Sequence, residues 1–248
     1  MDTKLIGTWS LIKESWNSFT KTWSQTTKIS IWFVYIGFIE FIDLAMVKFA
    51  PWMAPTYLLI IILVGVGALW VTIRLILSVL KEEESKSQDE KADQNLAWEL
   101  ILPVVWIALL QTLVLFGAFL LFIIPGIYLM ITLSFTQLIA VDQGIKGTKA
   151  LSASHDLVKG RWFQVLWRLF FGGLALSVPL FVLMIVIYAI LGYAVGPNRF
   201  LLLIASKNPD PLFSGTMTMV NSVLQAAFVP LFVILQVKLY KALQKIKA

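Results

Sequence analysis

The chain contains no cysteine and a single histidine, His155, among its 248 residues. The absence of cysteine excludes disulfides and thiolate chemistry, and it leaves a zinc site only one histidine and carboxylates as ligands. We therefore expect no metal and no other cofactor. Charged residues are also scarce, at 14% of the chain against 59% hydrophobic residues. Soluble domains have about a quarter charged residues, so this composition indicates a protein that is solvated by lipid.

Motifs that carry chemistry are missing as well. The sequence has no glycine-rich phosphate loop, no nucleophile elbow and no paired metal-ligand spacing. His155 lies between Ser154 and Asp156, and adjacent residues of a helix point in different directions, so these neighbours are poor catalytic partners. We expect a histidine that faces solvent or lipid headgroups, and a protein that is not an enzyme.

Long apolar runs are what the chain does have. A helix needs about 20 apolar residues to cross roughly 30 Å of hydrocarbon. These runs predict an all-α fold: one polytopic membrane helical bundle over residues 1–248 with about six transmembrane helices. The predicted spans are 29–50, 56–80, 98–124, 127–141, 166–195 and 216–238.

The fourth run is the shortest, and it directly follows Pro125 and Gly126. Because proline interrupts a helix, we expect a tight hairpin between the third and fourth runs. The alternative is a re-entrant pair within residues 98–141. Both arrangements leave the later segments on the same sides of the membrane, so charge distribution does not separate them.

Basic residues accumulate in alternate connecting segments, as they do on the cytoplasmic side of membrane proteins. The poorer side has Lys48, Arg199 and Lys207. This alternation predicts a multi-pass protein of the cytoplasmic membrane with both termini in the cytoplasm. The richer side carries Lys4, Lys13, Lys21, Lys28, Lys81, Lys86, Lys91, Lys146, Lys149, Lys159, Arg161, Lys238, Lys241, Lys245 and Lys247.

Residues 1–28 carry an apolar stripe at helical spacing. The stripe predicts an amphipathic helix in the membrane interface, with Trp9, Trp16 and Trp23 as anchors at headgroup depth. The alternative, which is compatible, is that this face packs under the protein's own bundle. The stripe comprises Leu5, Trp9, Ile12, Trp16, Phe19 and Trp23.

Two further segments are expected outside the hydrocarbon. Residues 147–160 are predicted to form a short cytoplasmic helix, followed by Trp162 as another interface anchor. Residues 81–95 form an acidic linker with six acids and three lysines, so the rest of the chain has a net charge of +9 (+6 overall, minus −3). This juxtamembrane charge favours contact with anionic lipid headgroups and not with nucleic acid, unless it reflects topology alone.

Several polar residues fall inside the predicted spans. Glu40 and Asp43 lie one turn apart on one helix face, and Arg74 is the nearest basic residue by depth. They form either a proton or cation relay or a buried ion pair that fixes helix register, unless Asp43 is wetted at the outer face. Asn221 and Gln225 share another face, which favours hydrogen bonds between helices or, alternatively, a polar path.

The chain resembles a group of bacterial six-span proteins, namely the membrane domain of glycerophosphoryl diester phosphodiesterases and its YciC-like relatives. The likeness is carried by IIPGIYL (123–129), Ser134 with Phe135, ALSASHDLVKGRW (150–162) and the N-terminal ESWNSFTKTW. His155 stands where that group usually has a bulky aromatic. The resemblance implies a helical membrane module. The phosphodiesterase activity of that family belongs to a separate barrel, which this chain does not contain.

These observations favour a non-enzymatic integral membrane protein that acts as a scaffold, an assembly factor or a lipid-associated module. The alternative is a small transporter or channel-like protein with a path lined by the polar residues above. A membrane enzyme would require Glu40, Asp43 and His155 to converge. Expected partners are membrane lipids, with a partner membrane subunit or a second copy of the chain as further options.

Overall fold

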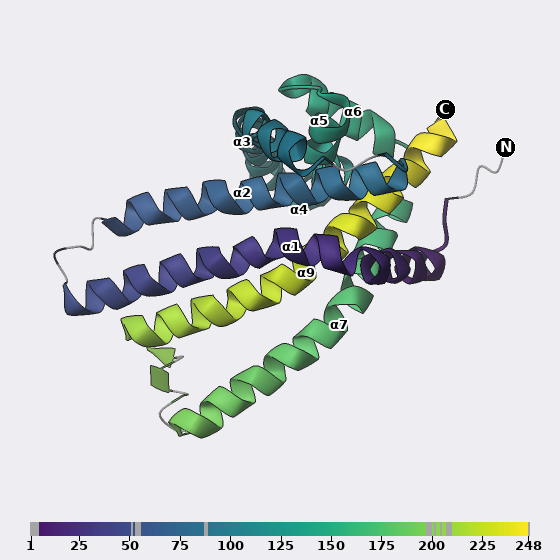
Figure 1. The fold of residues 1–248 in the computed structure, drawn as a ribbon. Coiled ribbons are helices and arrows are strands. Elements are labelled where there is room, and N and C mark those ends of the chain that lie inside the picture. The colour runs from purple at the N-terminus through teal and green to yellow at the C-terminus, as the bar shows by residue number, and fades with distance from the viewer. Residues whose placement is uncertain are drawn as a thin grey trace.

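The computed structural model describes residues 5–50, 52, 56–86, 89–196, 200, 202–203, 205–206 and 210–247. Over these residues the chain is helical and has no strand (Figure 1), which confirms the predicted all-α class. The basic residues Lys4, Arg199 and Lys207, and the side chain of Lys48, lie outside the described part. The helices are α1 (Thr8–Phe49), α2 (Thr56–Glu83), α3 (Glu90–Leu121), α4 (Ile123–Thr132), α5 (Thr136–Gln143), α6 (Thr148–Val158), α7 (Trp162–Val195) and α9 (Pro211–Lys247).

Six helical segments among the described residues are long and apolar enough to cross a membrane, the number that the sequence predicts. The fourth, Ile123–Gln143, consists of α4 and α5 together. Large apolar side chains are exposed along these segments, for example Leu102, Leu113 and Phe116 on α3. Contiguous apolar surface of this extent requires lipid as the solvent, which agrees with a multi-pass membrane protein.

The long helices α1 and α9 form the spine of the bundle, with α2 beside them (Figure 1). Their backbones approach closely through small residues. A methyl group on Gly37 of α1 would overlap the side chain of Ser222, and one on Gly215 of α9 would lie 2.9 Å from Phe41. Small residues allow this contact because lipid gives apolar helices little reason to associate unless their surfaces fit closely.

The structure corrects the predicted division between residues 1–28 and a first span at 29–50. Residues 8–28 and 29–49 both belong to α1, a continuous helix of 42 residues. At about 1.5 Å per residue it is roughly twice as long as the hydrocarbon is thick, so its N-terminal half extends beyond the lipid core. Apolar runs mark where lipid begins but not where a helix ends, because helical hydrogen bonds continue into water.

A second correction concerns the break before the fourth run. The helix stops at Phe122, whose backbone is extended, and α4 begins at Ile123, so Pro125 lies in the first turn of α4. Proline is tolerated there because the N–H groups of the first turn have no hydrogen-bond acceptor within the helix, so the missing N–H of proline costs no helical hydrogen bond. Gly126 packs directly against Phe119, and α3 and α4 form the expected hairpin.

The acidic linker is shorter than the predicted 81–95, because α2 continues to Glu83 and α3 begins at Glu90. Its first residues are held by α9: Lys238 forms an ion pair with Glu83, and Lys241 with Glu84 at 2.7 Å. Lys241 also lies 3.3 Å from Asp142 at the end of α5. Part of the basic surface that the sequence offers to lipid is therefore neutralised by the protein's own carboxylates.

Candidate functional site

Asp43 and Glu40, the predicted intramembrane acids, lie on the last turns of α1. Asp43 is buried, at 3% exposed, and one of its oxygens accepts a hydrogen bond from the Thr56 hydroxyl at 3.4 Å. Thr56 opens α2, so this contact joins the last turns of α1 to the start of α2. Glu40 is half-buried and has no ion-pair partner among the described residues. Neither carboxylate lines the groove or the polar cavity described below.

Arg74 has a different partner from the one expected by depth. Its guanidinium forms an ion pair with Glu90, the first residue of α3, at 3.4 Å. The guanidinium also lies over the ring of Trp70, one turn away, and its carbon Cζ is 4.9 Å from the ring centroid. The Arg74 side chain is only 5% exposed, and its Nε has no hydrogen-bond partner within the described part of the chain.

Arg74 lines a polar cavity of about 220 Å³ where α1, α2 and α3 meet. The cavity has a basic side formed by Arg74 and Lys28 and an acidic side formed by Glu90 and Asp93. Lys81 already forms an ion pair with Asp93, whereas Lys28 forms none with any described residue. The complete lining is Gln25, Lys28, Ile29, Arg74, Ser78, Glu90 and Asp93.

Asn221 and Gln225 of α9 line a separate groove between α7 and α9, with a volume of about 510 Å³. Figure 1 shows α7 diverging from the other long helices, and the α7 segment is the least buried of the six apolar segments. The groove is otherwise almost entirely apolar. Its lining is Leu174, Ser177, Val178, Leu180, Phe181, Met184, Asn221, Leu224, Gln225 and Phe228.

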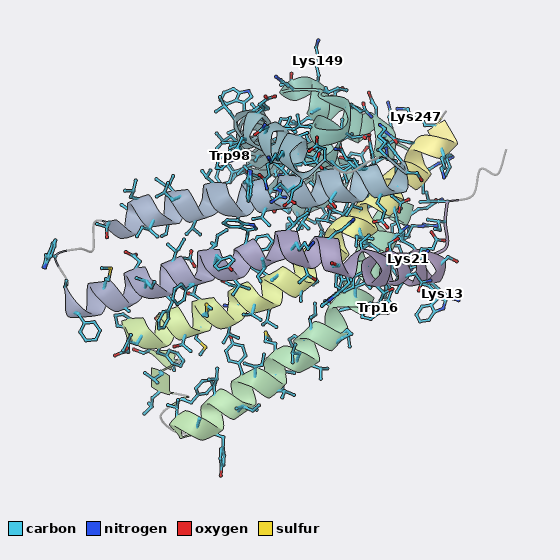
Figure 2. All side chains as sticks on the ribbon, in the orientation of Figure 1. Lys13, Trp16, Lys21, Trp98, Lys149 and Lys247 are labelled. Carbon is cyan, nitrogen blue, oxygen red and sulfur yellow. The ribbon has the colours of Figure 1, made fainter. Side chains whose placement is uncertain are left out.

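The predicted anchors Trp9, Trp16 and Trp23 are exposed, at 76%, 45% and 54%. The buried face of α1 shares Phe19 with the predicted stripe but is otherwise rotated from it, and it includes small polar residues. Figure 2 shows Trp16 with Lys13 and Lys21 at the same end of the bundle as Lys247. The exposed indoles are therefore available to an interface. The buried stripe comprises Leu11, Ser15, Phe19, Thr22, Thr26, Ser30 and Phe33.

The fourth predicted anchor, Trp162, opens α7 and packs edge-to-face on Tyr128 of α4, with ring centroids 5.6 Å apart. The hydroxyl of Tyr128 lies 3.3 Å from His155 Nε2, and His155 Nδ1 lies 3.5 Å from Asp156. Residues of two of the quoted motifs, IIPGIYL and ALSASHDLVKGRW, thus meet at one point. Asp43 contacts Thr56 instead, and the described contacts of His155 include neither Glu40 nor Asp43.

The sequence pattern gives Ser154 no role of its own, yet its hydroxyl bonds to the backbone at the break between α4 and α5. Its hydroxyl donates to the carbonyl of Thr132 at 2.7 Å and accepts from the N–H of Phe135 at 3.2 Å, and it is fully buried. This serine lies on α6 (Thr148–Val158), a short helix within the predicted segment 147–160. The signal in the sequence is a serine at helical spacing between Leu151 and Val158, where an apolar residue is expected.

Arg168 is a second residue whose role only the structure shows. Near the start of α7, it donates from Nε to the carbonyl of Ile6 at 2.6 Å and from a terminal nitrogen to that of Leu5 at 3.1 Å. These carbonyls lie just before α1. Position in sequence gives no signal for this contact, because the partners are backbone atoms 162 and 163 residues away.

Searches of family models, curated proteins and solved structures each find no match to this chain. The resemblance to the phosphodiesterase membrane domain and its YciC-like relatives thus stays a prediction. Within the described ranges, no three His, Asp or Glu side chains gather closely enough to hold a metal ion. The predicted polar residues occupy three separate places: the contact between the end of α1 and the start of α2, the cavity at Arg74, and the groove between α7 and α9.

Proposed function

We propose that this protein is a non-enzymatic, lipid-associated module of the cytoplasmic membrane, with both termini in the cytoplasm and with the groove between α7 and α9 occupied by a phospholipid acyl chain. The dispersal of the polar residues carries this proposal, because a transport path needs its polar groups in one connected series. The beginning of α1 and the end of α9 lie at one end of the bundle (Figure 1), which supports the orientation.

The groove favours an acyl chain because of its depth and chemistry. Ser177 lies about midway along α7, and Asn221 and Gln225 lie in the central part of the apolar segment of α9. Val178 and Phe181, on its walls, are more than half exposed. At that depth the surrounding solvent is lipid tails, so an acyl chain is the available apolar occupant.

The proposal is tested by the phospholipid that stays bound to the purified full-length chain in native mass spectrometry. Val178→Trp fills the groove and should reduce retained phospholipid several-fold, because the bulky side chain takes the place of the tail. Leu183→Trp is the matched control, since Leu183 is exposed on α7 but does not line the groove. Equal retention by both variants would contradict acyl-chain binding.

Transport, the second candidate, makes a separate prediction. The observation that favours transport is the burial of Asp43, one of whose carboxylate oxygens has no hydrogen-bond partner among the described residues. If proteoliposomes carry a proton or cation flux that Glu40→Gln with Asp43→Asn abolishes, transport replaces the proposed lipid-associated role. We expect no such flux and unchanged lipid retention in the double variant.

A further inference from the structure

We propose that the cavity between α1, α2 and α3 binds the zwitterionic headgroup of a phosphatidylethanolamine lipid. Its phosphate would take hydrogen bonds from Arg74 and Lys28, and its ammonium group would donate to Glu90. This site is separate from the groove between α7 and α9. The inference rests on the proposed association with lipid and adds the chemistry of the headgroup.

The depth of the cavity matches the headgroup layer. Counting about 20 residues back from Phe49, the end of α1, reaches residue 29 or 30, and counting the same number forward from Thr56, the start of α2, reaches about residue 76. Lys28 and Arg74 lie within two residues of these points. Two independent helices thus place the cavity at the edge of the hydrocarbon.

Three tryptophans mark the same level. Trp32, Trp70 and Trp98 form a chain of ring contacts across α1, α2 and α3, with centroid distances of 5.7 Å and 5.6 Å. Trp32 and Trp98 are about half exposed, and Figure 2 shows Trp98 on the α3 side of α2. Tryptophan is enriched at the boundary between tails and headgroups. Lys28 lies one turn from Trp32 on α1, and Arg74 lies one turn from Trp70 on α2. Each basic residue is on the side of its tryptophan nearer the proposed cytoplasmic end.

The arrangement of charge favours a zwitterion. Arg74 and Lys28 supply two positive charges, and Glu90, which is largely exposed, supplies a carboxylate at the rim. Asp93 is neutralised by Lys81. Glu90 pairs with Arg74 through one oxygen, Oε1, and an ammonium N–H donates to its carboxylate more strongly than the uncharged hydroxyl groups of a glycerol headgroup do. A trimethylated ammonium group has no N–H and loses that hydrogen bond.

One hydrogen-bond donor of Arg74 has no partner, which supports phosphate binding in the cavity. The Arg74 side chain is only 5% exposed, and its Nε has no hydrogen-bond partner among the described residues. Leaving a charged donor unsatisfied costs free energy, and a phosphate oxygen in the cavity would remove that cost. The cavity of about 220 Å³ would hold roughly seven waters at about 30 Å³ each, enough for a small headgroup.

The experiment uses the full-length protein in detergent micelles and measures the shift of its thermal unfolding with short-chain lipids. The probes are dihexanoyl phosphatidylethanolamine, phosphatidylcholine and phosphatidylglycerol, together with inorganic phosphate. We expect phosphatidylethanolamine to bind at least 10-fold more tightly than the other two lipids. Inorganic phosphate that binds as tightly would show a free-anion site and overturn the lipid assignment.

Two variants test the residues. Lys28→Gln and Glu90→Gln should each weaken phosphatidylethanolamine binding about 10-fold, and Glu90→Gln should also raise the relative affinity for phosphatidylglycerol. Lys91→Gln is the matched control, because Lys91 is the exposed neighbour of Glu90 and does not line the cavity. Unchanged binding in Lys28→Gln would overturn the proposal. Val178→Trp, which fills the groove between α7 and α9, should leave headgroup selectivity intact. An experiment can therefore contradict acyl-chain binding in the groove without contradicting headgroup binding in the cavity, and the reverse.

Discussion

Gly37 of α1 faces Ser222 of α9 with no room for a methyl group between them. This contact lies in the most extensive helix pairing of the described structure. The two helices begin and end the described chain, so their close approach joins its two halves. Their fit is specified by the absence of one side chain.

Gly37→Ala should destabilise the protein by about 1–3 kcal/mol, the usual cost of overpacking a close contact. The matched control is Gly65→Ala on α2, where an added methyl group meets open space. Gly65→Ala should leave stability unchanged or raise it by up to about 1 kcal/mol, because alanine favours the helix. Thermal unfolding in detergent measures both. Equal effects of the two substitutions would show that the α1–α9 contact is not tight.

Ser154→Ala should lower stability by about 1–3 kcal/mol, since it leaves the Thr132 carbonyl and the Phe135 N–H buried without their partner. Ser152→Ala, at an exposed position of the same helix, should change little. Hydrogen exchange of residues 132–136 should rise in the first variant alone. If exchange there is unaffected, the hydroxyl does not hold the break between α4 and α5.

Arg168→Gln should loosen the start of α1, because it removes hydrogen bonds to the carbonyls of Leu5 and Ile6. A charged hydrogen bond contributes about 1.5–3 kcal/mol, so amides in the first turns of α1 should exchange about 10-fold faster or more. Arg161→Gln is the control, because the Arg161 side chain forms no hydrogen bond or ion pair with the described residues of α1. Mass spectrometry of the N-terminal peptide reads the result, and equal exchange in both variants would refute the clamp.

Glu84 should make stability depend on acid pH. Hydrogen bonds from Lys241 and Lys86 lower the pKa of its carboxyl from 4.5 to about 2. Because the folded pKa is depressed, the stabilisation is fully present above about pH 4.5 and is lost as pH falls toward 2. Glu84→Gln should remove this component of the pH dependence. The difference between the unfolding temperatures of the two proteins should narrow over that window, and a constant difference would contradict the assignment.

The spans were predictable because the transfer of apolar side chains to lipid depends on each run by itself. The hairpin of α3 and α4 and the short helix α6 followed from local signals, namely Pro125 with Gly126 and the polar segment at 147–160. The starts and ends of the helices were less predictable. The hydrogen bonds of α1 and α2 continue past the lipid boundary, where polarity no longer distinguishes a helix from a linker.

The sequence identifies the candidate polar residues but does not identify the groups that they contact. Depth suggested Glu40 for Arg74, whereas α3 brings Glu90 to it. Vertical position along a helix can be counted from the sequence, but the direction in which each helix faces and the angle at which α3 approaches α2 cannot. The same limit hid the contact between Arg168 and the start of α1.

The sequence by itself determined that this protein is helical and solvated by lipid, with six apolar segments, because hydrophobicity and helical hydrogen bonding act within each segment. Only the tertiary structure decided which polar groups meet. It separated Asp43, Arg74 and Asn221 into three places and assembled the cavity at Lys28 and Arg74. The physical reason is that a buried charge is stabilised by whichever group packing brings within a few ångströms, and packing is a property of the whole bundle.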